Sequence, residues 1–192
     1  MNAIVLAGGK SSRYGSDKAL LKLENQTMIE LIVENLRKIF NKIYVISNAD
    51  EYSFLEDVVF AEDIIPGKGP LGGLYTGLKI SDEKYNFLSA CDMPFLSAEF
   101  FKFLKKQKKG YDVLVPEYRA YLEKLSGIYT TDLIPYIKRA LSNNQLKIKS
   151  FFPEVNLKVI KEEEIREIAD PEILFFNINY KDDFHKIKNI TK

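Results

Sequence analysis

The sequence of 192 residues has one cysteine, one histidine and no long apolar segment. The single cysteine, Cys91, excludes a disulfide within the chain and suits a reducing compartment. No stretch approaches the roughly 18 apolar residues that a membrane-spanning helix needs. The apolar run at positions 3–7 is also too short for a signal peptide. These absences predict a cytoplasmic protein that does not enter a membrane.

A surplus of charge of one sign is also absent. The chain has 28 Lys and Arg residues against 27 Asp and Glu residues, a formal net charge of +1 at pH 7. A protein without a strong overall field is not expected to bind nucleic acid or an acidic membrane surface. The length fits one ordinary domain with its own core. We therefore expect a single domain over residues 1–192.

Short apolar runs alternate with helix-period segments along most of the chain. The expected strands lie at 3–6, 42–47, 57–61, 85–90 and 111–115, and the expected helices at 27–40, 71–80, 97–108 and 132–141. The segment 121–129 allows a strand or a hairpin. This alternation predicts an α/β fold, a Rossmann-like three-layer sandwich with a mostly parallel sheet and helices on both faces. Right-handed crossovers would bring the C-terminal strand ends to one edge, where ligands bind.

Glycine and positive charge are concentrated in the loop after the first expected strand. Within 8–18 there are three glycines and three cationic side chains, Lys10, Arg13 and Lys18. Glycines let backbone N–H groups approach an anion closely, and the cations can neutralise phosphate oxygens. The spacing is not that of a Walker A loop. We predict a phosphate-binding loop here in preference to a basic surface turn.

A second glycine-rich segment, Gly-Lys-Gly-Pro-Leu-Gly at 67–72, matches the G-x-G-x-x-G pattern of dinucleotide-binding proteins. Asp92 also follows the last of these glycines by about 20 residues in the sequence, the separation expected of a ribose-binding acid. However, Pro66 and Pro70 stiffen the loop, and residues 63–65 separate it from the preceding strand. A dehydrogenase is therefore the less favoured interpretation. The same glycines would allow close approach of a base and ribose.

Polar residues follow two further expected strands. Asp92 comes directly after the strand 85–90, where a carboxylate facing the basic loop could hold Mg²⁺ against a triphosphate. A turn or helix-capping role is the alternative for Asp92, and the glycine-rich loop favours the metal. Asp63 ends another strand and could accept hydrogen bonds from a ribose or base. Asn177 and Asn179 would lie on one face if that segment is extended.

Four segments of the chain resemble the motifs of molybdenum cofactor guanylyltransferases. LAGGKSSRYGSDKALL at 6–21 resembles the signature L-A-G-G-x-S-x-R-M-G-x-D-K-x-L-L, and 62–73, 91–96 and 176–179 resemble the next three motifs in family order. The resemblance implies a nucleotide-diphospho-sugar transferase-like fold and transfer of GMP from GTP to molybdopterin, with release of pyrophosphate. It also allows molybdoenzymes or other cofactor-biosynthesis proteins as partners.

The resemblance further implies a role for individual residues. Those expected to contact the guanine nucleotide are Leu6, Ala7, Gly8, Asn48 and Asp63. Lys18 would bind its phosphates with help from Arg13, and Asp92 would coordinate Mg²⁺. Asn177 and Asn179 match a segment associated with molybdopterin.

The sequence departs from the family pattern at two places. Tyr14 replaces the usual Met, and Lys124 stands where the family has Pro in P-L-x-G-I-Y, which puts the local backbone there in question. Two alternative functions stay open. One is a sister nucleotidyltransferase that uses CTP or another phosphorylated acceptor. The other is a non-catalytic nucleotide-binding regulator. Gly8-Gly9 favours guanine by resemblance, because many cytidylyltransferases have Ala-Gly there.

Overall fold

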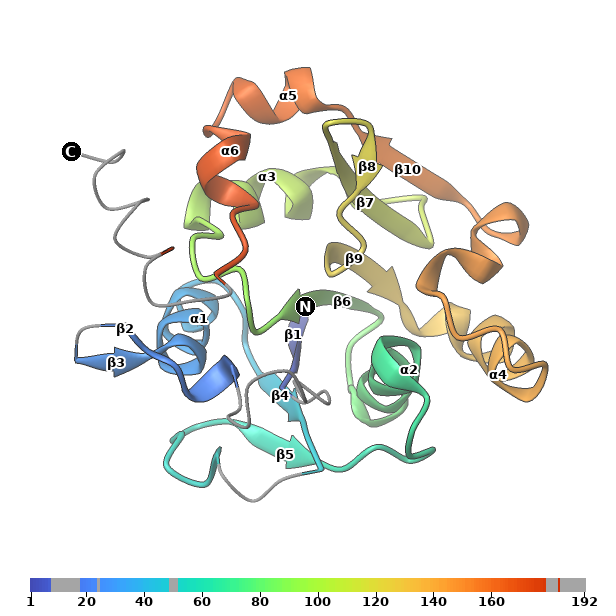
Figure 1. Cartoon of the computed structure of the whole chain (residues 1–192). Coiled ribbons are helices and arrows are strands. Elements are labelled where there is room, and N and C mark those ends of the chain that lie inside the picture. Colours follow the sequence, from blue (N-terminus) through green and yellow to red (C-terminus); the bar gives the residue numbers. More distant parts are fainter. Residues whose placement is uncertain (8–17, 24, 49–51, 179–182, 184–192) are drawn as a thin grey trace.

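The computed structural model describes residues 1–7, 18–23, 25–48, 52–178 and 183 (Figure 1). Within these residues eight strands form one sheet. Their bounds are β1 Asn2–Leu6, β4 Ile43–Ile46, β5 Val59–Ala61, β6 Tyr85–Ala90, β7 Val113–Tyr118, β8 Tyr121–Leu122, β9 Ser126–Thr130 and β10 Leu157–Ile160. Two further strands, β2 (Lys22–Leu23) and β3 (Gln26–Thr27), pair with each other.

The sheet is mostly parallel, as the sequence predicts. Its order is β10-β7-β9-β6-β1-β4-β5, with β8 paired to β7. On this path β9 is the strand that runs antiparallel to its neighbours. From β1 the chain builds β4 and β5 on one side and then returns to the other side with β6. The reversal places a topological switch point between β1 and β6, where open α/β sheets bind ligands.

Helices cover both faces of the sheet (Figure 1). One face carries α1 (Met28–Arg37), α3 (Ala98–Gln107), α5 (Glu162–Arg166) and α6 (Pro171–Leu174). The other carries α2 (Gly69–Ile80), α4 (Ile134–Ser142) and the 3₁₀ segment η4 (Ile148–Glu154). Side chains of β1 alternate between the two layers, with Ala3 and Val5 toward α1 and Ile4 toward α2. The three-layer sandwich is confirmed.

Local signals in the sequence explain where the helices begin. Thr27 and Glu30 form the capping box of α1: the Thr27 N–H donates to Glu30 Oε2 at 2.6 Å, and the Glu30 N–H donates to Thr27 Oγ1 at 3.4 Å. Ser97 caps α3 by accepting from the Phe100 N–H at 3.2 Å. The expected helix 132–141 is a 3₁₀ turn, η3 (Thr131–Leu133), followed by α4. No helix in the described ranges is long and apolar enough to cross a membrane.

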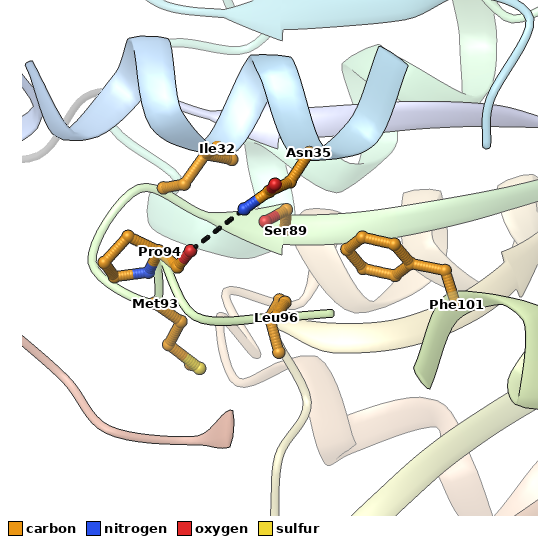
Figure 2. A pocket seen from close by; sticks show the side chains of 7 residues that line it. All are labelled: Ile32, Asn35, Ser89, Met93, Pro94, Leu96 and Phe101. Atoms are coloured by element: carbon orange, nitrogen blue, oxygen red, sulfur yellow. Dashed lines mark hydrogen bonds between the residues drawn. The ribbon is translucent and has the colours of Figure 1, made fainter. Parts of the chain in front are cut away.

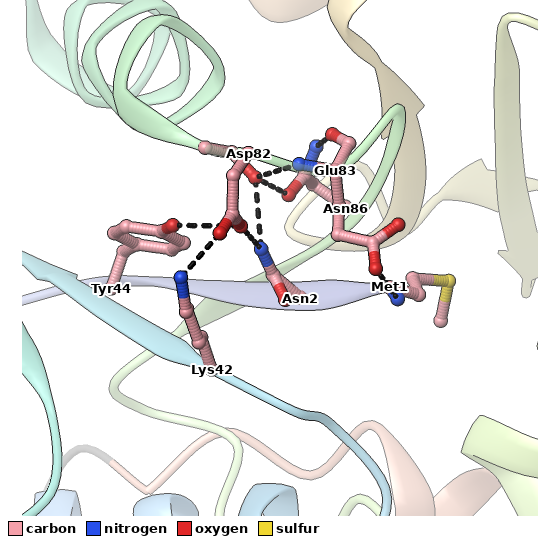
Figure 3. Close-up of polar contacts among 8 residues, drawn as sticks. Met1, Asn2, Lys42, Tyr44, Asp82, Glu83 and Asn86 are labelled. Atoms are coloured by element: carbon pink, nitrogen blue, oxygen red, sulfur yellow. Dashed lines mark hydrogen bonds and ion pairs between the residues drawn. The ribbon is translucent and has the colours of Figure 1, made fainter.

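A polar network ties the N-terminal ends of three strands together (Figure 3). Asp82, in the loop before β6, accepts from Asn2 Nδ2 at 2.7 Å and from the Tyr44 hydroxyl at 3.2 Å, and it also pairs with the Lys42 ammonium. The amino group of Met1 lies 3.1 Å from Glu83 Oε1. The network lies at the edge opposite the ligand-binding edge, so it should contribute to stability and not to activity.

This network predicts how stability changes with pH. Hydrogen bonds from Lys42 and Asn2 lower the pKa of Asp82 to about 2 from its ordinary value of 3.8. A carboxylate with a depressed pKa stabilises the fold above its unfolded-state pKa, and loses that contribution as the pH falls toward 2. We expect Asp82→Asn to lower the Tm at pH 7, with the difference from wild type shrinking between pH 4 and pH 2. Thermal unfolding by circular dichroism measures this. Parallel pH profiles for the two proteins would contradict it.

Candidate active site

Five of the predicted site residues lie at the C-terminal edge of the parallel strands: Leu6, Ala7, Asn48, Asp63 and Asp92. Register places four residues in one row across the sheet: Ala61, Ile46, Leu6 and Ala90. Two positions beyond this row, the chain reaches Asp63 after β5, Asn48 after β4 and Asp92 after β6. The equivalent position after β1 is Gly8, which lies outside the described residues. The sheet therefore brings together loops that are far apart in sequence.

Asn48 and Asp63 hold each other in a two-way hydrogen-bonded pair. The Asp63 N–H donates to Asn48 Oδ1 at 3.0 Å, and Asn48 Nδ2 donates to Asp63 Oδ2 at 3.2 Å. Burial raises the pKa of Asp63, while the bond from Asn48 acts in the opposite direction. Among the described residues nothing donates to the buried Asp63 Oδ1. A buried acceptor of this kind is costly unless it is satisfied, so it suits a hydroxyl or N–H of a ligand.

Helix α2 forms the wall beside Asp63. A Cβ added at Gly73 would lie 2.7 Å from Leu6 Cδ2 and 3.7 Å from Asp63 Oδ1. Only glycine therefore lets α2 approach the end of β1 this closely without a shift of Leu6. The segment 67–72 leads into this wall, with Gly67 at φ +74° and Gly69 at φ +60°. Gly67 and Gly69 serve the turn through their positive φ, while Gly72 and Gly73 let α2 pack closely beside Asp63; the approach of a base and ribose stays a prediction.

Thr76 connects α2 to the Asp63 loop. Its side chain is fully buried, accepts from the Ile64 N–H at 3.0 Å and donates to the Gly72 carbonyl at 3.1 Å. The hydroxyl thus fixes the backbone directly after Asp63. The sequence gives no indication of this role for Thr76, because an isolated Thr within a helix belongs to no recognisable motif.

Replacing Thr76 tests this link. Thr76→Val has nearly the same shape but leaves the Ile64 N–H without its acceptor, which should cost about 1–3 kcal/mol of the free energy of unfolding. We also expect weaker nucleotide binding, since Asp63 loses its support. Denaturant unfolding and nucleotide titration measure the two effects. Thr76→Ser keeps the hydroxyl and is the control; equal behaviour of the Val and Ser variants would refute the role.

Asp92 lies in the loop that leaves β6, and its Oδ1 is buried. Its backbone carbonyl accepts from the Ile178 N–H at 2.9 Å. This bond joins residues 176–178 to the Asp92 loop, although more than 80 residues separate them in sequence. Asn177 is exposed beside it in an irregular segment, not in a strand, and Asn179 lies outside the described residues.

A small pocket lies between α1 and the loop after Asp92 (Figure 2). It is lined by Ile32, Asn35, Ser89, Met93, Pro94, Leu96 and Phe101. Its empty space of about 150 Å³ is well below the roughly 300–1,000 Å³ of ligand pockets, so it is a packing gap and not the substrate site. Asn35 Nδ2 donates to the Pro94 carbonyl at 3.2 Å across it. That bond anchors the loop to α1.

The remaining predicted residues lie in or next to the glycine-rich loop 8–18. Arg13 and the rest of the loop 8–17 lie outside the described residues, and so does the side chain of Lys18. Its backbone begins the 3₁₀ turn η1 (Lys18–Leu20). Leu6 is the last residue of β1 and lies in the row, and Ala7 follows it with its N–H donating to the Ile46 carbonyl at 3.0 Å.

The donor atoms at this edge fit magnesium. The described residues contain no cluster of three or more His, Cys, Asp or Glu side chains. Magnesium does not need such a cluster, because it binds through one or two carboxylates and completes its shell with waters and substrate phosphates. The carboxylate of Asp92 is a ligand of that type.

Comparison with known proteins agrees with this geometry. The family model described as "MobA-like NTP transferase domain" matches residues 3–156. A protein of Carboxydothermus hydrogenoformans named "Probable molybdenum cofactor guanylyltransferase" is 38% identical over 190 residues, which cover 99% of this chain and 96% of that protein.

Solved structures show the same fold. Molybdopterin-guanine dinucleotide biosynthesis protein A from Archaeoglobus fulgidus superposes with a TM-score of 0.84 at 26% identity, over 100% of this chain and 98% of that one. A Francisella tularensis 2-C-methyl-D-erythritol 4-phosphate cytidylyltransferase superposes with a TM-score of 0.72 at 16% identity, over 97% and 98%. The second likeness shows the fold alone.

Proposed function

The chain belongs to the family of MobA-like NTP transferase domains, and we propose that it transfers GMP from GTP to molybdopterin and releases pyrophosphate. The observation that carries the proposal is that Asp63 and Asp92 both lie at the same edge of the sheet. They lie on either side of β1, which leads into the glycine-rich loop. A nucleotide lying across that edge would meet an acceptor at its nucleoside end and a carboxylate at its phosphate end.

The nucleoside end is assigned to Asp63. Its buried Oδ1 would accept a hydrogen bond from the ribose or the base, and Asn48 keeps the carboxylate oriented. The backbone of Leu6 and Ala7 borders the same space, with Gly73 opposite. A base held there would lie beside the contact between Leu6 and Gly73, because their close packing leaves no room between the two residues.

The phosphate end is assigned to the glycine-rich loop and Asp92. Lys18 and Arg13 would bind phosphate oxygens, and Gly8 would let backbone N–H groups approach them. Asp92 would hold a magnesium ion. Bound there, the ion supplies positive charge close to the phosphate oxygens.

The reaction requires no strong base. A phosphate oxygen of the acceptor forms a bond to the α-phosphorus of GTP, while the bond from that phosphorus to the bridging oxygen breaks and its electron pair leaves with pyrophosphate. The acceptor phosphate is already ionised at neutral pH, so no proton has to be removed. Catalysis then depends on positioning and on charge stabilisation by Lys18 and Arg13.

The acceptor end is assigned to the segment 176–179. The hydrogen bond from the Ile178 N–H to the Asp92 carbonyl holds residues 176–178 of this segment beside Asp92. Asn177 and Asn179 would offer amide donors and acceptors to molybdopterin there.

Nucleotide turnover tests the proposal. The full chain is incubated with each of GTP, CTP, ATP and UTP, with and without molybdopterin and Mg²⁺, and pyrophosphate release is measured. We expect release only with GTP, molybdopterin and Mg²⁺ together. Thermal unfolding with each nucleotide provides a second readout, and GTP should raise the Tm most.

Each alternative function predicts a different result. If CTP raises the Tm most and is turned over, the nucleotide substrate is CTP and not GTP. Nucleotide binding without pyrophosphate release would identify a non-catalytic regulator. Pyrophosphate release without Mg²⁺ would show that the reaction does not need the metal assigned to Asp92.

A further inference from the structure

The hairpin of β7 and β8 turns through two residues in the left-handed backbone region. Tyr118 pairs with Tyr121 at the end of the hairpin, which leaves Arg119 and Ala120 as the loop. Their φ angles are +49° and +62°. Asparagine and glycine favour this region in two-residue hairpin loops, and other residues are strained in it. Strain of this kind persists where the surrounding contacts compensate for it, so the contacts of the arginine are the place to look for a role.

Arg119 holds the two short helices that follow β10. Its N–H donates to Glu162 Oε2 on α5 at 2.9 Å, and its Nη2 donates to Glu172 Oε1 on α6 at 2.9 Å. Its guanidinium carbon also lies 5.0 Å from the centre of the Tyr118 ring. An exposed ion pair alone contributes little stability. Here one residue makes three contacts at once, so the end of the hairpin has a defined place against both helices.

Tyr118 extends this contact to the residue that follows α6. Its ring centre lies 5.7 Å from that of Phe175, and Phe175 also packs edge-on against Phe100 of α3 at 5.7 Å. Helix α6 has only four residues, and so short a helix depends on tertiary contacts for its position. The hairpin therefore helps to fix the place where the chain leaves α6.

The chain that leaves α6 is the segment assigned to the acceptor. Ile178 is fully buried in a small apolar cluster with Leu23 and Met28, and its N–H donates to the Asp92 carbonyl at 2.9 Å. Asn177 directly precedes this anchor and is exposed. The buried Ile178 on one side and the contacts of α6 with the hairpin on the other thus define where Asn177 lies.

The base of the hairpin is fixed by hydrogen bonds as well. The Glu123 N–H donates to the Pro116 carbonyl at 2.8 Å, and the Lys124 ammonium donates to the Leu122 carbonyl at 2.7 Å. The Tyr129 hydroxyl donates to the Lys124 carbonyl at 2.6 Å. These bonds hold the backbone around Lys124, where the family pattern has Pro. The hairpin is therefore anchored at its base and can support α6 at its end.

We propose that Arg119 is a positioning residue for the acceptor, which holds α6 so that Asn177 lies where molybdopterin binds. Arg119 acts through α6 and not by contact with the substrate. The inference rests on the proposed function, because Asn177 is assigned to molybdopterin there. It adds a residue that lies outside all four sequence motifs.

Glycine substitutions separate the effect of the side chain from that of the backbone. Arg119→Gly relaxes the turn and removes the guanidinium, whereas Ala120→Gly relaxes the same turn and keeps the guanidinium. We expect Arg119→Gly to raise the KM for molybdopterin about 2- to 30-fold and to leave the KM for GTP unchanged. Ala120→Gly is the matched control and should keep both KM values of wild type. Steady-state pyrophosphate release measures them.

Hydrogen exchange gives a second readout that needs no turnover. In the wild type the N–H groups of Phe176 and Ile178 donate to backbone carbonyls at 3.2 and 2.9 Å. Mass spectrometry of the peptide 171–178 should show faster exchange in Arg119→Gly than in wild type or Ala120→Gly. Thermal unfolding shows whether the variants fold. If the glycine variant does not, Arg119→Gln takes its place, since it also removes the charge.

Glu172 tests the path of the effect. Glu172→Gln should also raise the KM for molybdopterin, and the double variant with Arg119→Gly should be no worse than Arg119→Gly alone, because both changes break the same pair. Fully additive effects would show that Arg119 does not act through α6. Arg166 on α5 is exposed and pairs with Glu162. Arg166→Gln removes the same charge nearby and should leave the KM unchanged.

The outcomes separate this inference from the proposed function. Faster exchange in Arg119→Gly with an unchanged KM for molybdopterin would overturn the acceptor role of Arg119 and leave the proposed function intact. An equal rise in the KM for GTP would also overturn it, because the effect would then be general. If the wild type releases no pyrophosphate from GTP and molybdopterin, the proposed function fails and the acceptor role fails with it. Faster exchange would then still show that Arg119 holds α6.

Discussion

Asp92→Asn is expected to lower the rate of pyrophosphate release from GTP and molybdopterin by two or more orders of magnitude. The change keeps the size of the side chain and removes the charge that would hold the cation against the phosphates. Losing one charge contact made in the transition state typically costs this much. The fall should appear in kcat as well as in kcat/KM, because the contact strengthens as charge develops. Steady-state kinetics at saturating GTP measure it.

Two comparisons make the Asp92 result specific. Asp132→Asn also removes a carboxylate, but this one is exposed on η3 and paired with Lys84 at 2.6 Å, away from the strand ends that carry Asp63 and Asp92. Its turnover should stay within a few-fold of wild type. Thermal unfolding should show that both variants fold. Near-normal pyrophosphate release by the Asp92→Asn variant would refute the assignment of the active site.

The fold could be predicted from sequence wherever the signal was long. Apolar runs and helix periodicity located β1, β4 to β7 and α1 to α4, with boundary errors of a few residues. Phe40 shows the cause of one error: it stays buried against the sheet, yet α1 ends at Arg37. Burial continues past the helix, so apolar spacing alone overestimates its length.

Short elements carried too little pattern to be predicted. Strands β2 and β3 have two residues each, and α6 has four. Strand β10 is mostly half-buried and reads as an ordinary surface segment. These elements exist because tertiary contacts select them, since so few residues cannot fix a strand or helix alone.

The residues of the candidate site also fall into two groups, those that the sequence could predict and those that it could not. Asp63 and Asp92 were predictable, because each follows a strand and parallel strands end at one edge. Thr76 was not, since its position depends on how α2 docks against the Asp63 loop. The rejection of a dehydrogenase also has a structural reason: seven residues lie between Ala61, at the end of β5, and the start of α2 at Gly69. A dinucleotide fingerprint needs strand and helix joined by a tight turn.

Lys18→Ala is expected to reduce turnover by two or more orders of magnitude. Negative charge on the departing pyrophosphate grows as its bond to the α-phosphorus breaks, and the ammonium would stabilise that charge. The residue begins the turn η1, whose next residue, Ala19, is fully buried. The Met28 N–H donates to the Leu21 carbonyl at 3.0 Å, so the same segment is fixed to the start of α1. The backbone of Lys18 therefore leads directly into a segment that is fixed within the fold.

Lys22 supplies the matched control for this change. It lies four residues further on, in β2, and is exposed. Lys22→Ala removes the same charge from the same region, so long-range attraction of the nucleotide changes equally in both variants. A loss confined to Lys18→Ala must then come from direct contact. If the loss is in kcat, the contact forms mainly in the transition state; if KM alone rises, Lys18 binds GTP and transition state equally. Equal turnover of the two variants would show that the turn η1 is only structural, and charge stabilisation would then fall to Arg13.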